Sequence, residues 1–111
     1  MHGNFGHAEG YNNTVSGQYA HAEGFGNTVS TDSSHVEGIS NTVTGGRSHA
    51  EGSNTQALAY ASHTEGEKTI ASANWTHAEG YGSKASGKYS HAEGQGTLAK
   101  GENSHAEGYN T

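Results

Sequence analysis

Residues 7–20 read HAEGYNNTVSGQYA, and residues 21–34 repeat the pattern as HAEGFGNTVSTDSS. The tetrapeptide His-x-Glu-Gly recurs eight times in the chain, always at an interval of fourteen residues and without an insertion. A fixed period indicates supersecondary units that stack on one another, so the period predicts the fold. Each unit then points one histidine and one glutamate in the same direction. These residues are His7, Glu9, His21, Glu23, His35, Glu37, His49, Glu51, His63, Glu65, His77, Glu79, His91, Glu93, His105 and Glu107.

The composition excludes a conventional globular core. The chain has 111 residues, of which 18 are glycine and 29% are hydrophobic, with no proline and no cysteine. This apolar fraction is too small to offset chain entropy by burial in one large core. Disorder is disfavoured because a disordered tract needs no register. The absence of cysteine excludes disulfides and thiolate metal sites, and no signal peptide, transmembrane run or lipidation motif is present, so we expect no membrane insertion of this segment.

The negative charge of the chain is confined to the repeat. The formal net charge is −6, and eight of the eleven acidic residues are motif glutamates, so the three other acidic and five basic residues sum to +2. The glutamates form one stripe interleaved with an equal number of histidines. Because no basic patch exists, the sequence argues against a nucleic-acid partner.

The unit of fourteen residues, counted from its histidine, has a fixed pattern of small residues. The second, seventh, ninth and fourteenth positions hold Ala, Val, Ser, Thr or Asn in every complete unit. Side chains alternate between the two faces of a strand. Two short strands per unit therefore direct these small residues into a thin, flattened coil, whereas the first and third positions point outward. Glycine every fourteen residues and many Ser, Thr and Asn residues disfavour a helix.

Two corners per unit are predicted seven residues apart. The fourth position is always glycine and the eleventh is glycine or a small residue, and glycine suits both positive φ and close backbone approach. Residues 1–6 keep this phase, with Gly3 at the eleventh position. Successive coils pair in parallel at roughly 4.8 Å, so about eight coils form a rod on the order of 38 Å long. The predicted turn glycines are Gly10, Gly24, Gly38, Gly52, Gly66, Gly80, Gly94 and Gly108.

The two outward faces of the coil differ in how much they vary. The eighth position holds Thr, Gln, Ile, Lys or Leu, as expected of residues that face water. The first and third positions are His and Glu in all eight units. A solvated face does not require this identity. We therefore expect the His/Glu face to be covered by another subunit.

The segment Ser90-His91-Ala92-Glu93-Gly94, followed by Ala99-Lys100-Gly101, resembles the fourteen-residue repeats of trimeric autotransporter adhesin heads. Their pattern is roughly Ser-Val-Ala-Ile-Gly-x-x-Ala-x-Ala-x-Gly-x-x, and the resemblance covers essentially the whole chain. Repeats of phage tail fibres and spikes are also similar. The resemblance implies a left-handed parallel β-roll in which three chains pack side by side, at a virion tail or a bacterial cell surface. Where the family has interface Val and Ile, this chain has His and Glu, which implies a polar interface ladder.

These observations predict an all-β protein with two short strands per coil, assembled as a homotrimer. Residues 1–111 form a single repeat domain of about eight coils, which we interpret as a piece of a longer fibre. The predicted function is a structural segment of a trimeric extracellular fibre whose His and Glu residues face neighbouring subunits. An enzyme is disfavoured because eight equivalent units without an irregular pocket do not resemble a catalytic site.

Two binding functions remain as alternatives. Three symmetry-related imidazoles could bind a transition metal on the trimer axis, with Glu in support; otherwise we expect no cofactor. The second alternative is a glycan or other host-surface receptor that contacts aromatic side chains flanking the corners. These aromatic residues are Tyr11, Tyr19, Phe25, Trp75, Tyr81, Tyr89 and Tyr109.

Overall fold

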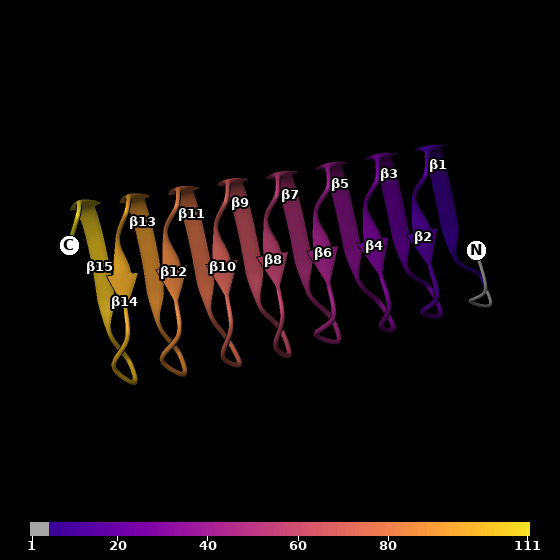
Figure 1. Cartoon of the computed structure of the whole chain (residues 1–111). Coiled ribbons are helices and arrows are strands. Elements are labelled where there is room, and N and C mark those ends of the chain that lie inside the picture. The colour runs from indigo at the N-terminus through magenta and orange to yellow at the C-terminus, as the bar shows by residue number, and fades with distance from the viewer. Residues whose placement is uncertain (1–4) are drawn as a thin grey trace.

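Fifteen β-strands wind through the chain as one solenoid (Figure 1), in a computed structural model that describes residues 5–111. Strands of five residues alternate with strands of two, and no helix occurs between residues 5 and 111. The long strands form an eight-stranded sheet, composed of β1 (His7–Tyr11), β3 (His21–Phe25), β5 (His35–Ile39), β7 (His49–Ser53), β9 (His63–Glu67), β11 (His77–Tyr81), β13 (His91–Gln95) and β15 (His105–Tyr109). The short strands form a seven-stranded sheet, composed of β2 (Thr14–Val15), β4 (Thr28–Val29), β6 (Thr42–Val43), β8 (Gln56–Ala57), β10 (Ile70–Ala71), β12 (Lys84–Ala85) and β14 (Leu98–Ala99).

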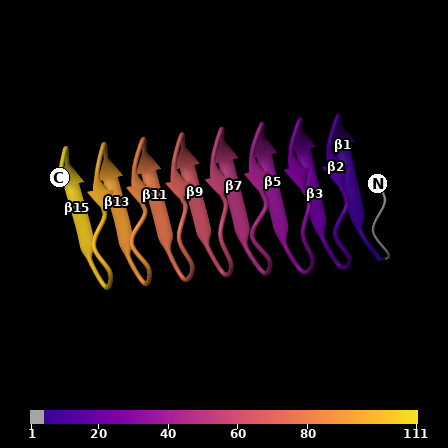
Figure 2. The ribbon, with the colours of Figure 1, turned by 60° about the horizontal axis from the view of Figure 1, so that its bottom comes forward.

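Both sheets are parallel and in register with the sequence repeat. His49 pairs with His63 and Glu51 with Glu65, so each residue lies beside the residue one repeat later. Figure 2 shows the coils as a single row from β1 to β15. The principal extents of 39 × 22 × 10 Å confirm the predicted length and thinness of the rod. The described residues contain no helix that could span a membrane.

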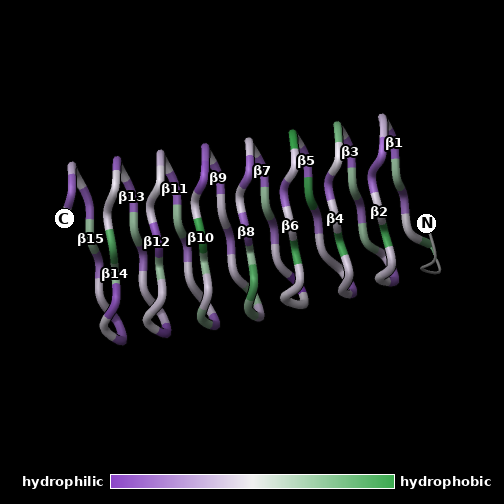
Figure 3. Tube along the Cα trace, viewed as in Figure 1, coloured by the Kyte–Doolittle hydropathy of each residue, from purple (hydrophilic) through white to green (hydrophobic). Residues whose placement is uncertain are grey.

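The interior is filled by the small residues that the repeat predicts. Val15, Val29, Val36 and Val43 are fully buried in the first coils, and buried alanines take their place from residue 50 onward. Figure 3 shows apolar residues recurring along the row of short strands, above all in β2, β4 and β6. Burying a valine side chain is worth about 1.5–3 kcal/mol. The first half of the rod therefore has the stronger apolar core.

A buried polar row connects neighbouring coils at the seventh position. The Asn27 side-chain amide donates to the carbonyls of Glu23, at 2.7 Å, and Gly38, at 2.8 Å. Its side-chain oxygen accepts the backbone N–H of Asn41 at 3.0 Å. Buried polar groups that are paired in this way avoid the cost of desolvation without a partner. The row thus links one coil to the next in a chain with few large apolar side chains.

The residues with positive φ are only in part those that the sequence predicts for the two corners of each coil. Each glycine of the fourth position has φ between 102° and 115°, but lies inside a five-residue strand. Further left-handed residues occur at the sixth position, such as Lys68 (φ 58°), and at the thirteenth, such as Trp75 (φ 56°). The eleventh-position glycines, such as Gly45, do not have positive φ, because the chain turns two residues later. The prediction for Gly3 and the rest of residues 1–4 lies outside the described residues.

Candidate functional site: the His/Glu face

The outer surface of the eight-stranded sheet presents all sixteen motif residues, and we call it the His/Glu face. From β3 to β13, each long strand alternates an outward histidine, a buried small residue and an outward glutamate, whereas Ala8 of β1 is exposed and Ala106 of β15 is half-buried. The sequence predicted this arrangement because side chains alternate along a strand. In the inner coils the side chains are about one third exposed: His49 at 36% and Glu51 at 33%. The face is therefore neither a solvated surface nor part of the interior.

The histidine rings form a continuous stack along the rod. From His21 to His105 the ring centroids of successive coils are 4.5–4.8 Å apart, and the ring planes differ by at most 13°. The spacing follows from the parallel pairing of the strands that carry them. Each ring covers a face of the next, which explains why side chains on an open sheet surface are only one third exposed.

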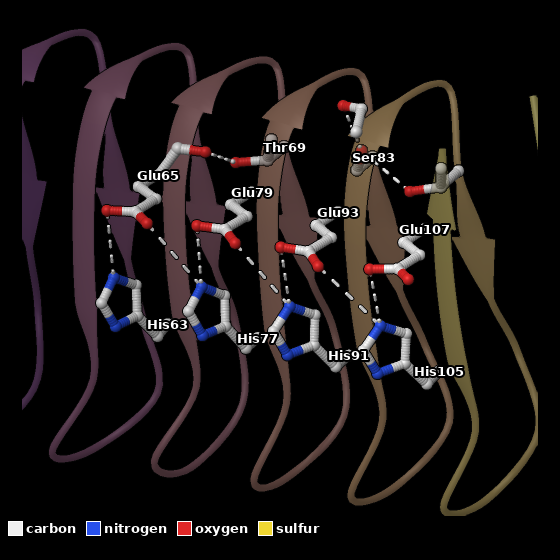
Figure 4. Close-up of polar contacts among 12 residues, drawn as sticks. His63, Glu65, Thr69, His77, Glu79, Ser83, His91, Glu93, His105 and Glu107 are labelled. Carbon is white, nitrogen blue, oxygen red and sulfur yellow. Dashed lines mark hydrogen bonds and ion pairs between the residues drawn. The ribbon is translucent and has the colours of Figure 1, made fainter. Parts of the chain in front are cut away.

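Each of the eight motif histidines lies beside the glutamate of its own coil. The Nε2 atom of His49 is 3.6 Å from Oε2 of Glu51, and the corresponding distances in the other coils are 3.4–3.8 Å. In the last three coils Nε2 also lies 3.8–3.9 Å from Oε1 of the preceding glutamate (Figure 4). These contacts lie within one chain, and the polar ladder between subunits stays a prediction.

Most of these contacts are too long for hydrogen bonds. The His7–Glu9 pair at 3.4 Å satisfies hydrogen-bond geometry. In six inner histidines the Nε2 atom is buried and has no hydrogen-bond partner among the described residues. A buried polar atom without a partner costs about 1–3 kcal/mol. These six atoms are His21, His35, His49, His63, His77 and His91 Nε2.

The glutamates form a row in which neighbouring carboxyl groups shift one another's pKa. Hydrogen bonds with Glu37 and Glu65, followed by burial and the charges of these neighbours, raise the pKa of Glu51 to about 7. The same causes, with Glu65 and Glu93 as neighbours, raise the pKa of Glu79 to about 8. Hydrogen bonds with adjacent carboxyl groups lower the pKa of Glu65. Like charges at one-coil spacing do not all ionise together, so the direction of the pKa shift alternates between lowered and raised from Glu37 to Glu93.

At the centre of the row, the negative charge of the glutamates is not balanced by protonation of His49 and His77. Burial, followed by the charges of neighbouring histidines, lowers the pKa of His49 and of His77. Stacking removes each of these two rings from water and places like charges above and below it, which favours the neutral imidazole.

A groove runs along the His/Glu face beside the glutamates. Its volume is about 970 Å³, and it is lined by the glutamate and the following glycine of seven successive coils, from Glu9 to Gly94. The glycines form its floor because they carry no side chain. A Cβ at Gly52 would lie 1.9 Å from the carbonyl oxygen of Gly66, so no larger residue fits. The groove was not predicted from the sequence, although the signal for it is the Glu-Gly pair that every repeat contains.

Several His/Glu groups have the composition of a metal site. The potential ligand atoms of His63, Glu65 and His77 lie within 4.8 Å of one another, and so do those of Glu93, His105 and Glu107. Imidazole nitrogen and carboxylate oxygen are both zinc ligands. The groups are formed within one chain, whereas the sequence-based alternative placed three histidines of three chains around one ion.

The aromatic residues lie at both edges of the rod and stack in pairs. Trp75 and Tyr89 have ring centroids 5.1 Å apart with an angle of 4° between planes, and Tyr60 meets Trp75 edge-on at 6.0 Å. Lys88 lies 6.0 Å from the Trp75 ring centroid, and Arg47 donates to the Tyr60 hydroxyl at 3.0 Å. The sequence analysis did not include Tyr60, which precedes the thirteenth position by one residue. Tyr60, Trp75 and Tyr89 are 39–50% exposed.

Comparisons with known proteins identify a similar fold. No protein-family model and no curated protein matches the chain. Among solved structures, the chain is similar to the crystal structure of the N-terminal fragment of bacteriophage phi29 gene product 12. The TM-score is 0.67 at 13% sequence identity, over 93% of this chain and 19% of that chain. At this identity the likeness shows the fold alone: a parallel β-solenoid repeat that a bacteriophage protein also contains.

Proposed function

We propose that this chain is a structural segment of an extracellular fibre, of a phage tail or a bacterial adhesin, in which three copies pack through the His/Glu face. The observation that carries the proposal is the identity of sixteen outward residues on one face of a rod whose opposite face varies. The interior does not require this identity, because neither residue points inward. A symmetric assembly does require it, because each coil then meets an equivalent coil of its neighbour.

The length and shape of the rod support a mechanical function over a catalytic one. A solenoid 39 Å long and 10 Å thick spans distance with few residues, and side-by-side packing would thicken and stiffen it. The solenoid likeness to a phi29 protein supports the phage origin. The resemblance to adhesin heads, noted above, supports three chains around one axis, with polar residues in place of apolar ones.

Mass in solution tests this proposal. Light scattering on the native protein is expected to give about three times the chain mass of 11.4 kDa. The measurement is made at micromolar concentration, with circular dichroism as a check that the β-structure is retained. A folded monomer under these conditions would contradict the trimer and, with it, the interface function of the His/Glu face.

A second function, receptor binding, is favoured by the Tyr60–Trp75–Tyr89 edge. Exposed aromatic rings beside Lys88 provide stacking surface and polar groups, which suit a glycan. This edge is separate from the His/Glu face, so a fibre segment could also contact a host surface. The rings cover one another within the row, which leaves little free ring face and ranks this function second.

A further inference from the structure

Near the C-terminal end of the row, each imidazole nitrogen lies between two carboxylates. His77 Nε2 is 3.9 Å from Glu65 Oε1 and 3.6 Å from Glu79 Oε2. His105 repeats the arrangement with the next two glutamates. Figure 4 shows each ring edge directed at the gap between successive carboxylates. We call such a group of one histidine and two glutamates a junction.

The distances in a junction do not suit hydrogen bonds. Hydrogen bonds from nitrogen to oxygen are about 2.7–3.2 Å long, and His77 Nε2 is buried without a hydrogen-bond partner. Two atoms bound to one tetrahedral zinc ion, each about 2.0–2.2 Å away, lie roughly 3.3–3.6 Å apart. The spacing is therefore close to that of ligands around a shared cation, and small side-chain rotations supply the difference.

Ring orientation decides which residues share a cation. His77 and His91 are stacked with 13° between their planes, and His91 and His105 with 6°. The lone pair of a ring nitrogen lies in the ring plane, so stacked rings direct their lone pairs in parallel. Two successive histidines do not converge on one ion. The carboxylates on either side of one histidine do converge on it.

We propose that the junctions bind divalent transition-metal cations, such as zinc, through one imidazole nitrogen and one oxygen from each of two successive glutamates of the same chain. Mixed imidazole and carboxylate ligands suit zinc and related ions. The groove gives a cation access from solvent to Glu65, Glu79 and Glu93, which line it. The His105 junction lies beyond the groove, where the side chains of His105 and Glu107 are 55% and 66% exposed. The site is complete in one chain and does not rest on the trimer.

Charge sets the expected number of ions. One dication binds two carboxylates and, at the His77 junction, displaces the proton that the raised pKa of Glu79 keeps bound near neutral pH. Alternate junctions therefore fill without competition. The His77 junction uses Glu65 and Glu79, whereas the His105 junction uses Glu93 and Glu107. An ion at His91 would share ligands with both and lie roughly 4.8 Å from each. We therefore expect about two ions per chain from these three junctions.

Calorimetric titration with zinc chloride tests the proposal. The full chain is prepared without a polyhistidine tag, treated with a chelator and dialysed at neutral pH. Glu107→Gln removes one ligand from the His105 junction in the last coil, where it does not disturb stacking of later coils. Glu102→Gln makes the same charge change in the same part of the rod but away from the row. Zinc stoichiometry is expected to fall by about one ion per chain in E107Q and to stay unchanged in E102Q.

Other outcomes overturn the assignment. The junctions are excluded if the chain binds no zinc, or if E107Q binds as much zinc as the unaltered chain. One ion per three chains, bound independently of the glutamates, would assign the metal to histidines of different chains and reject the junctions. A folded monomer that binds zinc as expected would reject the trimer and leave the junctions in place.

Discussion

The two broad faces of this solenoid come from one repeat but obey different constraints. On the eight-stranded sheet, the outward residues of every coil are His and Glu. On the seven-stranded sheet, the equivalent outward residue is Thr14, Gln56, Ile70, Lys84 or Leu98, according to the coil. Both sheets bury equally small residues inside. Packing within the coil therefore limits both faces equally, and the additional constraint on the His/Glu face has its source outside the interior.

The largest loss of stability is expected from substitution of a glycine on the His/Glu face, where the structure has no room for a side chain. In Gly52→Ala the new Cβ would lie 1.9 Å from the Gly66 carbonyl oxygen, at a φ of 115°. Left-handed strain and this clash together are expected to lower the free energy of unfolding by about 3 kcal/mol or more. Gly46→Ala is the matched control, because its Cβ would meet only the Tyr60 ring at 3.6 Å. Denaturant unfolding of both variants checks the difference, and equal stability would contradict the close approach of coils along this face.

Much of the fold follows from the period. In-register stacking places each residue beside its equivalent, and alternation then decides which side chains are buried, so the core and the His/Glu face were predictable. The left-handed conformation at the sixth position had a local signal in Asn12 and Gly26. At Lys68 and Trp75 no such signal exists, because closure of the coil imposes a conformation that these residues do not favour alone.

The chemistry of the site was less predictable than its location. The sequence placed His and Glu on one face, but it did not reveal that the rings stack, that Nε2 of His49 is buried, or that successive carboxyl groups interact. These properties depend on the side-chain conformations adopted at one-coil spacing. A repeat therefore predicts which residues meet more reliably than it predicts their protonation.

A change of pH is expected to have an intermediate effect on stability. The effect reports on the His/Glu face, because the glutamates and histidines with shifted pKa values lie there. In the folded state the pKa of Glu51 is about 7 and that of Glu79 about 8, both above the ordinary value of 4.5. Their stabilising contribution is therefore complete below pH 4.5 and is lost as the pH rises through 7 to 8. The lowered pKa of Glu65 has the opposite sign: its contribution is present above 4.5 and is lost below it. The lowered pKa of His49 adds a loss as pH falls below 6.5.

Melting temperature is therefore expected to be highest between about pH 4.5 and 6.5 and to fall on both sides. In the double variant Glu51→Gln, Glu79→Gln, two neutral side chains replace the groups that lose protons, so the alkaline fall is expected to shrink. Glu102→Gln, outside the row, is expected to leave the profile unchanged. A chelator in every sample removes the influence of metal. An alkaline fall of the same size in the double variant would show that the carboxyl row is not its source.

The smallest effect is expected on the variable face. Lys84 is exposed on β12, and the first three coils carry threonine at the same place: Thr14, Thr28 and Thr42. Lys84→Thr therefore introduces a residue that the same strand position already accepts, with a β-branched side chain suited to a strand. Exposed substitutions of this kind change the free energy of unfolding by about 0.5 kcal/mol or less. Unfolding curves and light scattering on the variant check both stability and mass. A lower mass for K84T would mean that subunits meet through the seven-stranded sheet, and the assignment of the interface to the His/Glu face alone would then be wrong.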